Sequence, residues 1–290
     1  MSIELSLISI GMPLYNAEKH IRQSLDSLLR QTHMDFEIIV SDNCSTDGTF
    51  EIIQEYATRD VRIKAFQQPE NAGPILNFQF VLQQASGKYF MWRSYDDWSD
   101  DNYLETLGQL LDSDSSIDLA VANIVKVSEI EEKPIQLDIA NTTGSHSFSC
   151  ALHMLKVSHP GWMYGLFRRQ VALKAINDVV KNFPHVWGWD HLILFPTVSR
   201  NRVGVSNKTQ FFQRETGISN SRYRPRLPKE QISLATDFYR VCQRSYQSSN
   251  ASLIAKFAMT IYLLKYTSSK TEKFTRILRI ALKLRKPSAG

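Results

Sequence analysis

Two adjacent carboxylates, Asp96 and Asp97, follow directly on an apolar run at Tyr89–Trp92. Neighbouring negative charges repel each other, so this arrangement is unfavourable unless a cation or solvent compensates it. Carboxylates at the end of a strand suit a hard divalent ion, Mg²⁺ or Mn²⁺, which keeps some of its waters and bridges to phosphate oxygens. The alternative is a solvated acidic turn in which Asp100 or Asp101 caps the next helix. We favour the metal site.

The surrounding pattern predicts the elements that must position these acids. Strands are expected at residues 5–13, 36–40, 62–66, 88–92 and 117–125, and helices at 16–31, 49–57, from 74 onward and at 102–111. We expect Asn16 to cap the first of these helices and Pro74 to begin the third. Alternating units of this length predict an α/β fold with a mainly parallel sheet and helices on both faces.

Polar loops follow four of the predicted strands. In chain order they are PLYNAE, SDNCSTDG, QPENAG and RSYDDW. In an open parallel sheet, ligands bind beyond the carboxyl ends of the strands, so we expect these loops to form one site. The sequence lacks the usual phosphate motifs G-x-G-x-x-G and G-x-x-x-x-G-K-S/T, which disfavours dinucleotide redox chemistry and P-loop hydrolysis. A bound nucleotide would then need a cation for its phosphates, and the acidic pair offers a place for one.

The order of these motifs resembles the family 2 inverting glycosyltransferases, which have the GT-A fold. The resemblance begins with SIGMPLYNAEKHIRQSLDSLLRQTHMDFEIIVSDNCSTDGT and continues through NAGPILN, ASGKYFMW and YDDW. It covers about the first 125 residues in the correct order and spacing. It implies a GT-A domain at residues 1–227, with a nucleotide-sugar half at 1–125 and an acceptor half at 126–227, followed by a helical extension at 228–290.

The same resemblance assigns a donor site for a nucleotide-diphosphate sugar, expected to be a UDP-sugar. It implies that Pro13, Tyr15 and Asp42 line the base and ribose pocket, and that Asn71, Gly73 and Asn77 lie close to the donor. Asp96 and Asp97 correspond to the end of the metal-binding D-x-D element, with Asp96 as the main ligand. The first Asp of that element falls at Ser94, which is a poor substitute for a carboxylate.

Two further roles fall on the second half of the chain. Inverting transfer needs a carboxylate that takes the proton of the attacking hydroxyl, and the resemblance places this base at Asp190 in VWGWDHLILF. The alternative is that Asp190 only caps the helix that follows it. The segment FFQRETGISNSRY resembles the part that closes over the donor phosphates, with Arg214 as the contact. Many relatives carry a histidine two positions later, and this chain has Thr216 there.

The C-terminal part carries most of the positive charge. From Pro228 onward the pattern is helical, with helices expected at 229–247 and 251–266. Residues 270–290 predict a basic amphipathic helix, suited either to an anionic membrane surface or to docking on the protein body. Since the basic residues gather in this tail, we expect no nucleic-acid partner. Three dispersed cysteines and a start unlike a signal peptide favour a cytoplasmic protein, peripheral on the inner face of the plasma membrane.

Three functions fit these observations. The first is a metal-dependent inverting glycosyltransferase that acts on a saccharide or lipid-linked acceptor, in bacterial surface polysaccharide or lipopolysaccharide synthesis by resemblance. The second is a nucleotidyltransferase, which should show a Gly-rich basic loop after the first strand that GMPLYNAEKH lacks. The third is a noncatalytic module that binds nucleotide sugars, which Ser94 in the metal motif allows. Asp190 distinguishes the first from the third.

Overall fold

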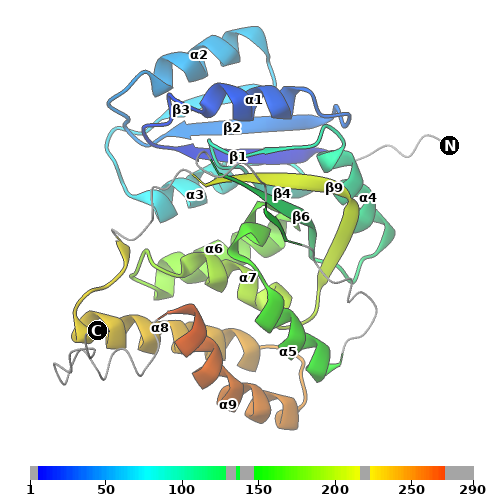
Figure 1. Ribbon diagram of the computed structural model, residues 1–290, viewed down its shortest axis with the longest axis vertical. Helices are drawn as coiled ribbons and strands as arrows, with labels where there is room; N and C mark the ends of the chain where they lie inside the picture. Colours follow the sequence, from blue (N-terminus) through cyan, green and yellow to red (C-terminus); the bar gives the residue numbers. More distant parts are fainter. Residues whose placement is uncertain (1–5, 129–134, 138–146, 216–222, 272–290) are drawn as a thin grey trace, which may run out of the picture.

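One sheet runs through the part of the chain that the computed structural model describes, residues 6–128, 135–137, 147–215 and 223–271 (Figure 1). Its strands are β1 (Ile8–Leu14), β2 (Phe36–Asp42), β3 (Ile63–Gln67), β4 (Tyr89–Trp92), β5 (Trp98–Ser99), β6 (Leu119–Ser128), β7 (Ile135–Leu137), β8 (Leu166–Arg168) and β9 (Val203–Glu215). Neighbouring strands follow the order β3-β2-β1-β4-β8-β6-β9-β5, and β7 pairs with β6.

Most of these strands point the same way. Strands β3, β2, β1 and β4 are parallel neighbours. Strand β8 is antiparallel to both β4 and β6, so β6 has the direction of β4, and β9 runs parallel to β6. Among the described strands, β5, β7 and β8 have the opposite direction. The predicted α/β fold with a mainly parallel sheet is therefore confirmed.

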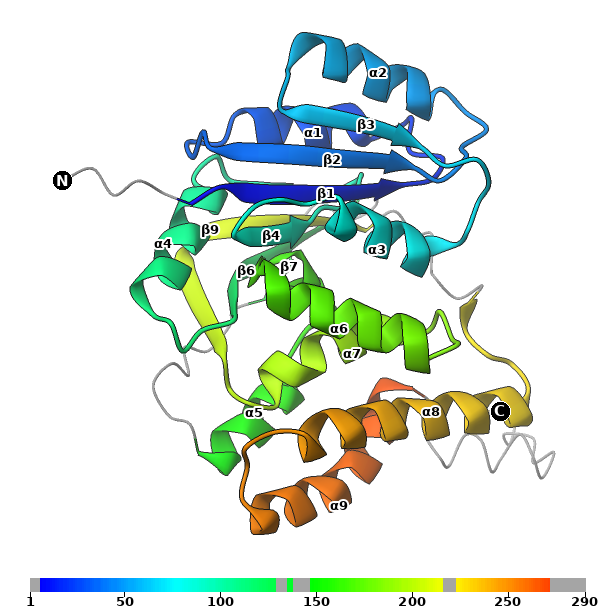
Figure 2. The ribbon, with the colours of Figure 1, turned by 180° about the vertical axis from the view of Figure 1, so that it is seen from behind.

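Helices cover both faces of the sheet. They are α1 (Ile21–Leu29), α2 (Thr49–Arg59), α3 (Pro74–Gln83), α4 (Tyr103–Ser113), α5 (Phe148–Val157), α6 (Arg169–Asn182), α7 (Trp189–Val198), α8 (Pro228–Gln247) and α9 (Leu253–Lys270), with a short 3-10 helix η1 (Pro160–Tyr164). Helix α1 lies in front of the sheet in Figure 1, and α3 lies in front of it in Figure 2. Helices α1, α2 and α4 pack on one core, and α3, α6, α7, α8 and α9 pack on the other.

Strand β4 shows how alternation builds these two cores. Phe90 and Trp92 join the core of α3 and α6, whereas Tyr89 and Met91 join the core of α1 and α4. Successive side chains of a strand point to opposite faces, so one short apolar run can supply both layers. Because Trp92 at the end of β4 is fully buried, the strand end has a fixed position, and the acidic pair follows it in the next loop.

Helices α8 and α9 pack in the same core as α3, α6 and α7, on one face of the sheet. The ring of Tyr266 lies 5.7 Å from that of Phe195 in α7 and 5.9 Å from that of Phe238 in α8. Both α8 and α9 appear at the positions expected from the sequence.

The boundary between a GT-A domain and a helical extension at 227/228 stays a prediction, and most of the basic tail at 270–290 lies outside the described residues. No helix among the described residues combines the length and the apolarity needed to cross a bilayer.

The start of α1 differs from the expectation. The helix begins at Ile21 after His20, and Asn16 does not cap it. Instead, Asn16 adopts a left-handed backbone with φ +52°, and its Oδ1 accepts a hydrogen bond from the backbone N–H of Thr46 at 3.0 Å. The Asn16 side chain therefore bonds to the loop after β2 and does not cap α1. This hydrogen bond joins the loop after β1 to the loop after β2. Pro74, in contrast, occupies the first turn of α3 as predicted.

Sequence patterns missed several elements of the second half. Strand β8 has only three residues, and α6 follows it directly without a break. Strand β9 pairs with β6 over most of its length, with an irregular register between Ala122 and Asn123. Within the segment 128–160, interpreted as an excursion or lid, the structure describes β7 and α5, whereas residues 129–134 and 138–146 lie outside the described part.

Glu37 links four parts of the sheet at the amino ends of its strands. Its carboxylate accepts hydrogen bonds from Ser9 Oγ at 2.6 Å, Lys64 Nζ at 2.6 Å and both the N–H and the Oγ of Ser86, at 2.8 and 2.7 Å. Burial opposes ionisation of this group, but these hydrogen bonds outweigh it and lower the pKa of Glu37 to about 2. The ionised form of Glu37 therefore stabilises the folded state.

We expect Glu37→Gln to reduce the free energy of unfolding at pH 7 by about 1–3 kcal/mol, because buried donors lose a charged acceptor. Since the folded pKa of about 2 lies below the reference value of 4.5, this contribution is complete above pH 4.5 and is lost as the pH falls through 2. Urea unfolding between pH 7 and pH 3 measures it. Glu55→Gln, at an exposed ion pair, is the control. A difference that stays constant with pH would contradict the prediction.

Candidate active site

The carboxyl ends of β1, β2 and β4 bring the predicted loops to one edge of the sheet. Leu14, the last residue of β1, is paired with Asp42, the last residue of β2. Gly11 in β1 is paired with Trp92 at the end of β4. Because these strands are parallel, the loops that follow them open on the same side. Tyr15 emerges there directly after β1 and is exposed, whereas Pro13 lies buried within the strand.

A polar corner forms between β2 and the start of α3. Asp42 is fully buried and accepts hydrogen bonds from the N–H and the Oγ of Ser45. Asn43, which the sequence analysis did not single out, donates from Nδ2 to Asn71 Oδ1 at 3.0 Å and to Gly73 O at 3.2 Å. Asn43 therefore sets the position of the loop before α3. The only sequence signal for it is its place directly after a strand in a turn-rich loop.

Gly73 and Asn77 contribute to this corner in different ways. Gly73 has φ +86°, and a Cβ built on it would contact nothing within 4 Å, so this backbone borders open space. Asn77 is buried and its side chain is fully engaged: Oδ1 accepts from Ser41 Oγ at 2.6 Å, and Nδ2 donates to the backbone oxygens of Leu14 and Ser41. Asn77 thus holds α3 against the strand ends, beneath the surface that a donor could reach.

The acidic pair is unequally exposed. Asp97 is 2% exposed and accepts a hydrogen bond from the backbone N–H of Arg214 at 2.9 Å. Burial, followed by the charge of Asp96, raises the pKa of Asp97 to about 8. Asp96 is half-buried, and its Oδ1 accepts a hydrogen bond from Ser94 Oγ. Ser94 therefore orients Asp96, although it adds no negative charge of its own.

A buried cation that the sequence analysis missed lies behind this pair. Arg93 is fully buried, donates from Nη2 to Ser99 Oγ at 2.7 Å and lies 5.2 Å from the ring centroid of Phe211. Burial lowers the pKa of Arg93 to about 10, and the charge of Asp97 opposes that shift. The sequence signal for Arg93 is a basic residue placed directly between a buried strand and an acidic pair.

Arg214 comes to the same place from the far end of β9. Besides its backbone bond to Asp97, its Nε donates to the backbone oxygen of Asp96 at 3.2 Å, and its Nη2 donates to Gln23. Its guanidinium lies 5.0 Å from the ring centroid of Trp98. The structure thus brings Arg214 and the acidic pair together as expected. Thr216, two residues further on, lies outside the described residues.

Asp190 lies within electrostatic reach of the same group of acids. After burial, the charges of Asp97, Asp96 and Asp190 all raise the pKa of Tyr164, so the acidic pair and Asp190 act on the same tyrosine. Asp190 is the second residue of α7, and its Oδ1 accepts from the backbone N–H of His191 at 2.8 Å. The cap position itself is taken by Gly188, in the left-handed conformation.

Other candidates have structural roles. Asn102, and neither Asp100 nor Asp101, is the cap residue of α4, and it makes no side-chain cap bond. The Oδ2 of Asp100 instead accepts from Gln210 N at 2.8 Å in β9. Trp162 is buried in the core, whereas Tyr164 is half-buried and is subject to the charges of Asp96 and Asp97.

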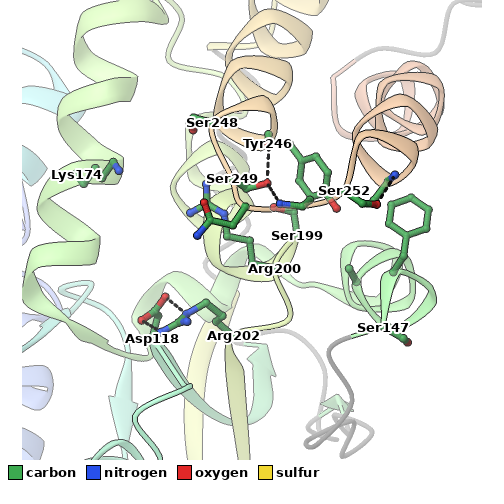
Figure 3. Close-up of a pocket in the computed structure, with 15 residues that line it drawn as sticks. Asp118, Ser147, Lys174, Ser199, Arg200, Arg202, Tyr246, Ser248, Ser249 and Ser252 are labelled. Carbon is green, nitrogen blue, oxygen red and sulfur yellow. Dashed lines mark hydrogen bonds and ion pairs between the residues drawn. The ribbon is translucent and has the colours of Figure 1, made fainter.

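A separate cavity of about 740 Å³ lies between α6, the start of β9 and the α8–α9 connection (Figure 3). Asp118 and Arg202 precede β6 and β9 directly, so this cavity lies at the amino ends of strands whose carboxyl ends face the candidate site. Arg202 Nη2 pairs with Asp118 Oδ1 at 2.9 Å, and Arg200 donates to Ser245 O near the end of α8. Because these charges have structural partners, we place the candidate active site at the carboxyl edge.

The sequence profile described as Glycosyl transferase family 2 matches residues 9–172, more than half of the chain. The chain belongs to this family. The matched segment contains β1 to β4, the acidic pair and Tyr164, but ends before Asp190 and Arg214. The family assignment from the sequence is confirmed.

Two curated relatives match shorter segments. Glycosyltransferase GlyA of Streptococcus pneumoniae is 36% identical over 124 residues, which are 43% of this chain and 18% of GlyA. Poly(ribitol-phosphate) beta-N-acetylglucosaminyltransferase TarS of Staphylococcus aureus is 32% identical over 111 residues, which are 37% of this chain and 19% of TarS. The matches therefore span less than a fifth of the length of either relative.

Solved structures show the same fold over nearly the whole chain. The crystal structure of S. aureus TarS 1-349 in complex with UDP-GlcNAc superposes with a TM-score of 0.72 at 19% identity, over 96% of this chain and 76% of that one. Mannosyltransferase PcManGT of Pyrobaculum calidifontis, in complex with GDP-Man and Mn²⁺, gives a TM-score of 0.57 at 14% identity, over 98% of this chain and 77% of that one. The chain thus has the GT-A fold.

We expect Asp97→Asn to increase the stability of the metal-free protein at pH 8, because the buried carboxylate is costly when it ionises. The folded pKa of about 8 lies above the reference value of 3.8, so stability is fully present below pH 3.8 and is lost as the pH rises through 8. Thermal unfolding with a chelator at pH 5 and pH 9 should show a gain that is larger at pH 9. Asp101→Asn, at an exposed acid nearby, is the control. A stabilisation equal at both pH values would count against it.

Proposed function

We propose that this protein transfers a sugar from a nucleotide-diphosphate sugar to a saccharide or lipid-linked acceptor, with inversion and with the help of Mg²⁺ or Mn²⁺. The observation that carries the proposal is that Asp96, Asp97 and Asp190 all act electrostatically on Tyr164, while Arg214 is bonded to the acidic pair at the carboxyl edge of a GT-A sheet. It combines a place for a charged leaving group with a carboxylate that can accept a proton.

The donor is proposed to lie along the loops after β1, β2 and β4. Tyr15, exposed directly after β1, is proposed to border the base and ribose, with the buried Asp42 holding the loop beneath them through Ser45, and the backbone at Gly73 borders open space. The UDP-GlcNAc bound by TarS and the GDP-Man bound by PcManGT support a nucleotide-sugar donor. We propose a UDP-sugar, as expected from the sequence.

The acidic pair fits a divalent ion held largely by its substrate. Among the described residues, no cluster of three or more His, Cys, Asp or Glu side chains forms a complete protein metal site. Mg²⁺ commonly uses one or two carboxylates together with substrate phosphates and water, and the Asp96–Asp97 pair provides those carboxylates. The raised pKa of Asp97 shows that its charge lacks full compensation. We propose Asp96 as the main ligand, oriented by Ser94.

Different residues of the chain contribute to different parts of the proposed reaction. The acceptor oxygen attacks the anomeric carbon while the bond from that carbon to the diphosphate breaks, and Asp190 takes the hydroxyl proton. When bound, the metal would neutralise charge that grows on the diphosphate. Arg214 adds a guanidinium beside the acidic pair, where it can contact phosphate oxygens. Tyr164, whose pKa is raised by the charges of both the acidic pair and Asp190, is proposed to shape the space in which the two substrates meet.

The biological setting is proposed to be bacterial surface polysaccharide or lipopolysaccharide synthesis. The name of TarS, which describes transfer to poly(ribitol-phosphate), supports a polymeric acceptor of this kind. This chain matches only 18% of GlyA and 19% of TarS, so the identity of the acceptor is part of the proposal.

Asp190→Asn is expected to lower the rate of sugar transfer about 100- to 10,000-fold, because the amide cannot take the proton. Binding of UDP with Mn²⁺ should remain nearly unchanged, since Asp190 is proposed to act on the acceptor and not on the donor. A coupled assay for released UDP measures the rate, and calorimetry measures binding. The matched control is Asp178→Asn in α6. Full activity of Asp190→Asn would remove this residue from the mechanism.

Asp96→Ala is expected to weaken metal-dependent binding of UDP by about 10-fold or more, because one of two carboxylate ligands is lost. Calorimetry with Mn²⁺ and with a chelator separates the metal-dependent part from the rest. Asp101→Ala, a nearby exposed acid, should bind UDP like the unaltered protein. If Asp96→Ala kept the full gain in affinity that Mn²⁺ provides, the acidic pair would not be the metal site.

A further inference from the structure

One side of α9 exposes a row of large apolar side chains. The helix packs on the rest of the protein through its other side, where Met259, Leu263 and Tyr266 are buried. In both views α9 lies at the end of the molecule opposite α2 (Figure 1, Figure 2). We call the exposed row the α9 outer face. Its five side chains are between 56% and 84% exposed: Leu253, Ile254, Phe257, Ile261 and Leu264.

The spacing of these residues places them in one stripe along the helix. Phe257, Ile261 and Leu264 follow one another at the intervals of three or four residues that neighbours on one side of a helix have. Leu253 and Ile254 extend the stripe by one further turn. Single exposed apolar residues are ordinary on a protein surface, but a contiguous apolar patch marks a surface that contacts a partner or a membrane. The α9 outer face is therefore a contact surface.

The charges beside the outer face restrict what can cover it. The second half of α8 lies alongside α9, with Tyr239 Oη donating to Thr260 O at 3.3 Å. Residues 238–271, which comprise this half of α8 and the whole of α9, contain no Asp or Glu. Their side chains are uncharged or positive. The basic residues in this stretch are Arg240, Arg244, Lys256, Lys265 and Lys270.

This charge pattern disfavours an occupant from the chain itself. A second copy would present the same basic, acid-free surface. Residues 272–290 of this chain carry six Lys or Arg and one Glu, so they would add further positive charge. Like charges that meet in an interface are unfavourable, whereas a negatively charged surface is complementary to this one. The favoured occupant is therefore apolar inside and negatively charged at its surface.

We propose that the α9 outer face docks on the surface of an anionic lipid bilayer. In a helix that lies in the membrane interface, apolar side chains enter the boundary between headgroups and acyl chains, and basic residues attract anionic lipids. Helix α9 supplies both kinds of residue. This surface precedes the tail at 270–290, to which the sequence pattern assigned membrane contact. A lipid-linked acceptor, as proposed above, would lie in the surface on which the protein docks.

The test measures flotation of the full chain with vesicles. We expect binding to vesicles of phosphatidylglycerol and phosphatidylcholine, and little binding to phosphatidylcholine alone. Phe257→Gln with Ile261→Gln should weaken binding to the mixed vesicles about 10- to 100-fold, because two apolar side chains no longer enter the bilayer. The matched control, Met34→Gln with Val61→Gln, alters apolar residues that are 65% and 97% exposed elsewhere. It should bind like the unaltered protein.

The contribution of charge is tested separately. Lys256→Gln with Lys265→Gln should weaken binding to the mixed vesicles about 10-fold or more, because two lysines near the membrane no longer attract anionic lipid. Lys181→Gln with Lys208→Gln, at exposed lysines of α6 and β9, should change it little. Equal binding of the unaltered protein to mixed vesicles and to phosphatidylcholine alone would reject an anionic surface as the partner.

Phe257→Trp supplies a variant that keeps the outer face apolar, in case the glutamine variants fold poorly. It should bind at least as strongly as the unaltered protein, since tryptophan favours the membrane interface. Lipids with brominated acyl chains should quench the fluorescence that the added indole contributes. An added indole that bound vesicles leave unquenched would contradict the docking. Circular dichroism and thermal unfolding monitor the fold of every variant.

Two further results would overturn the proposal. If Phe257→Gln with Ile261→Gln bound vesicles as the unaltered protein does, lipid contact would belong to another part of the chain, such as residues 272–290. If light scattering showed a dimer that this double variant converts to a monomer, the outer face would belong to a second copy. None of these outcomes depends on sugar transfer, so they leave the proposed function untouched.

Discussion

The acidic pair at the end of β4 is the constraint around which the rest of the site is arranged. Asp97 is buried next to Asp96, so its ionised form depends on compensation from elsewhere. The protein supplies part of it with the buried guanidinium of Arg93 and the backbone N–H of Arg214. The raised pKa of Asp97 reflects the cost of its buried charge that these two groups do not compensate. In the proposed function, a divalent ion bound together with a diphosphate would compensate the remaining negative charge of the acidic pair.

The fold brings the acidic pair and a second carboxylate, Asp190, within electrostatic reach of one tyrosine. Parallel strands β1, β2 and β4 direct their loops to one edge, while β6 and β9 carry the chain back so that Arg214 reaches Asp97. Tyr164, the last residue of η1, is subject to the charges of both the acidic pair and Asp190. In the proposed reaction, the acidic pair belongs to the donor side, where negative charge must be neutralised, and Asp190 belongs to the acceptor side, where a carboxylate takes a proton.

The helices after residue 227 are integrated with the catalytic part of the fold. Tyr266 and Phe238 pack on α7 in the same core as strands of the sheet, and the end of α9 lies against Gly188 at the start of α7. Helix α7 carries Asp190, so the packing of α8 and α9 sets where that carboxylate lies. A sequence boundary at 227/228 can therefore mark a change in pattern without marking a change in function.

The sequence by itself determined the α/β class, the first four strands, the helices α8 and α9, and the polar loops at the carboxyl edge of the sheet. These follow from local periodicity and from short loops after parallel strands, which act over a few residues. Only the tertiary structure decided that Asn16 serves the loop after β2, that Asn77 is buried and that Arg93 lies behind Asp97. It alone brought the end of α9 beside Gly188 at the start of α7, because contacts between residues about 80 apart depend on how helices pack, and no local pattern encodes that packing.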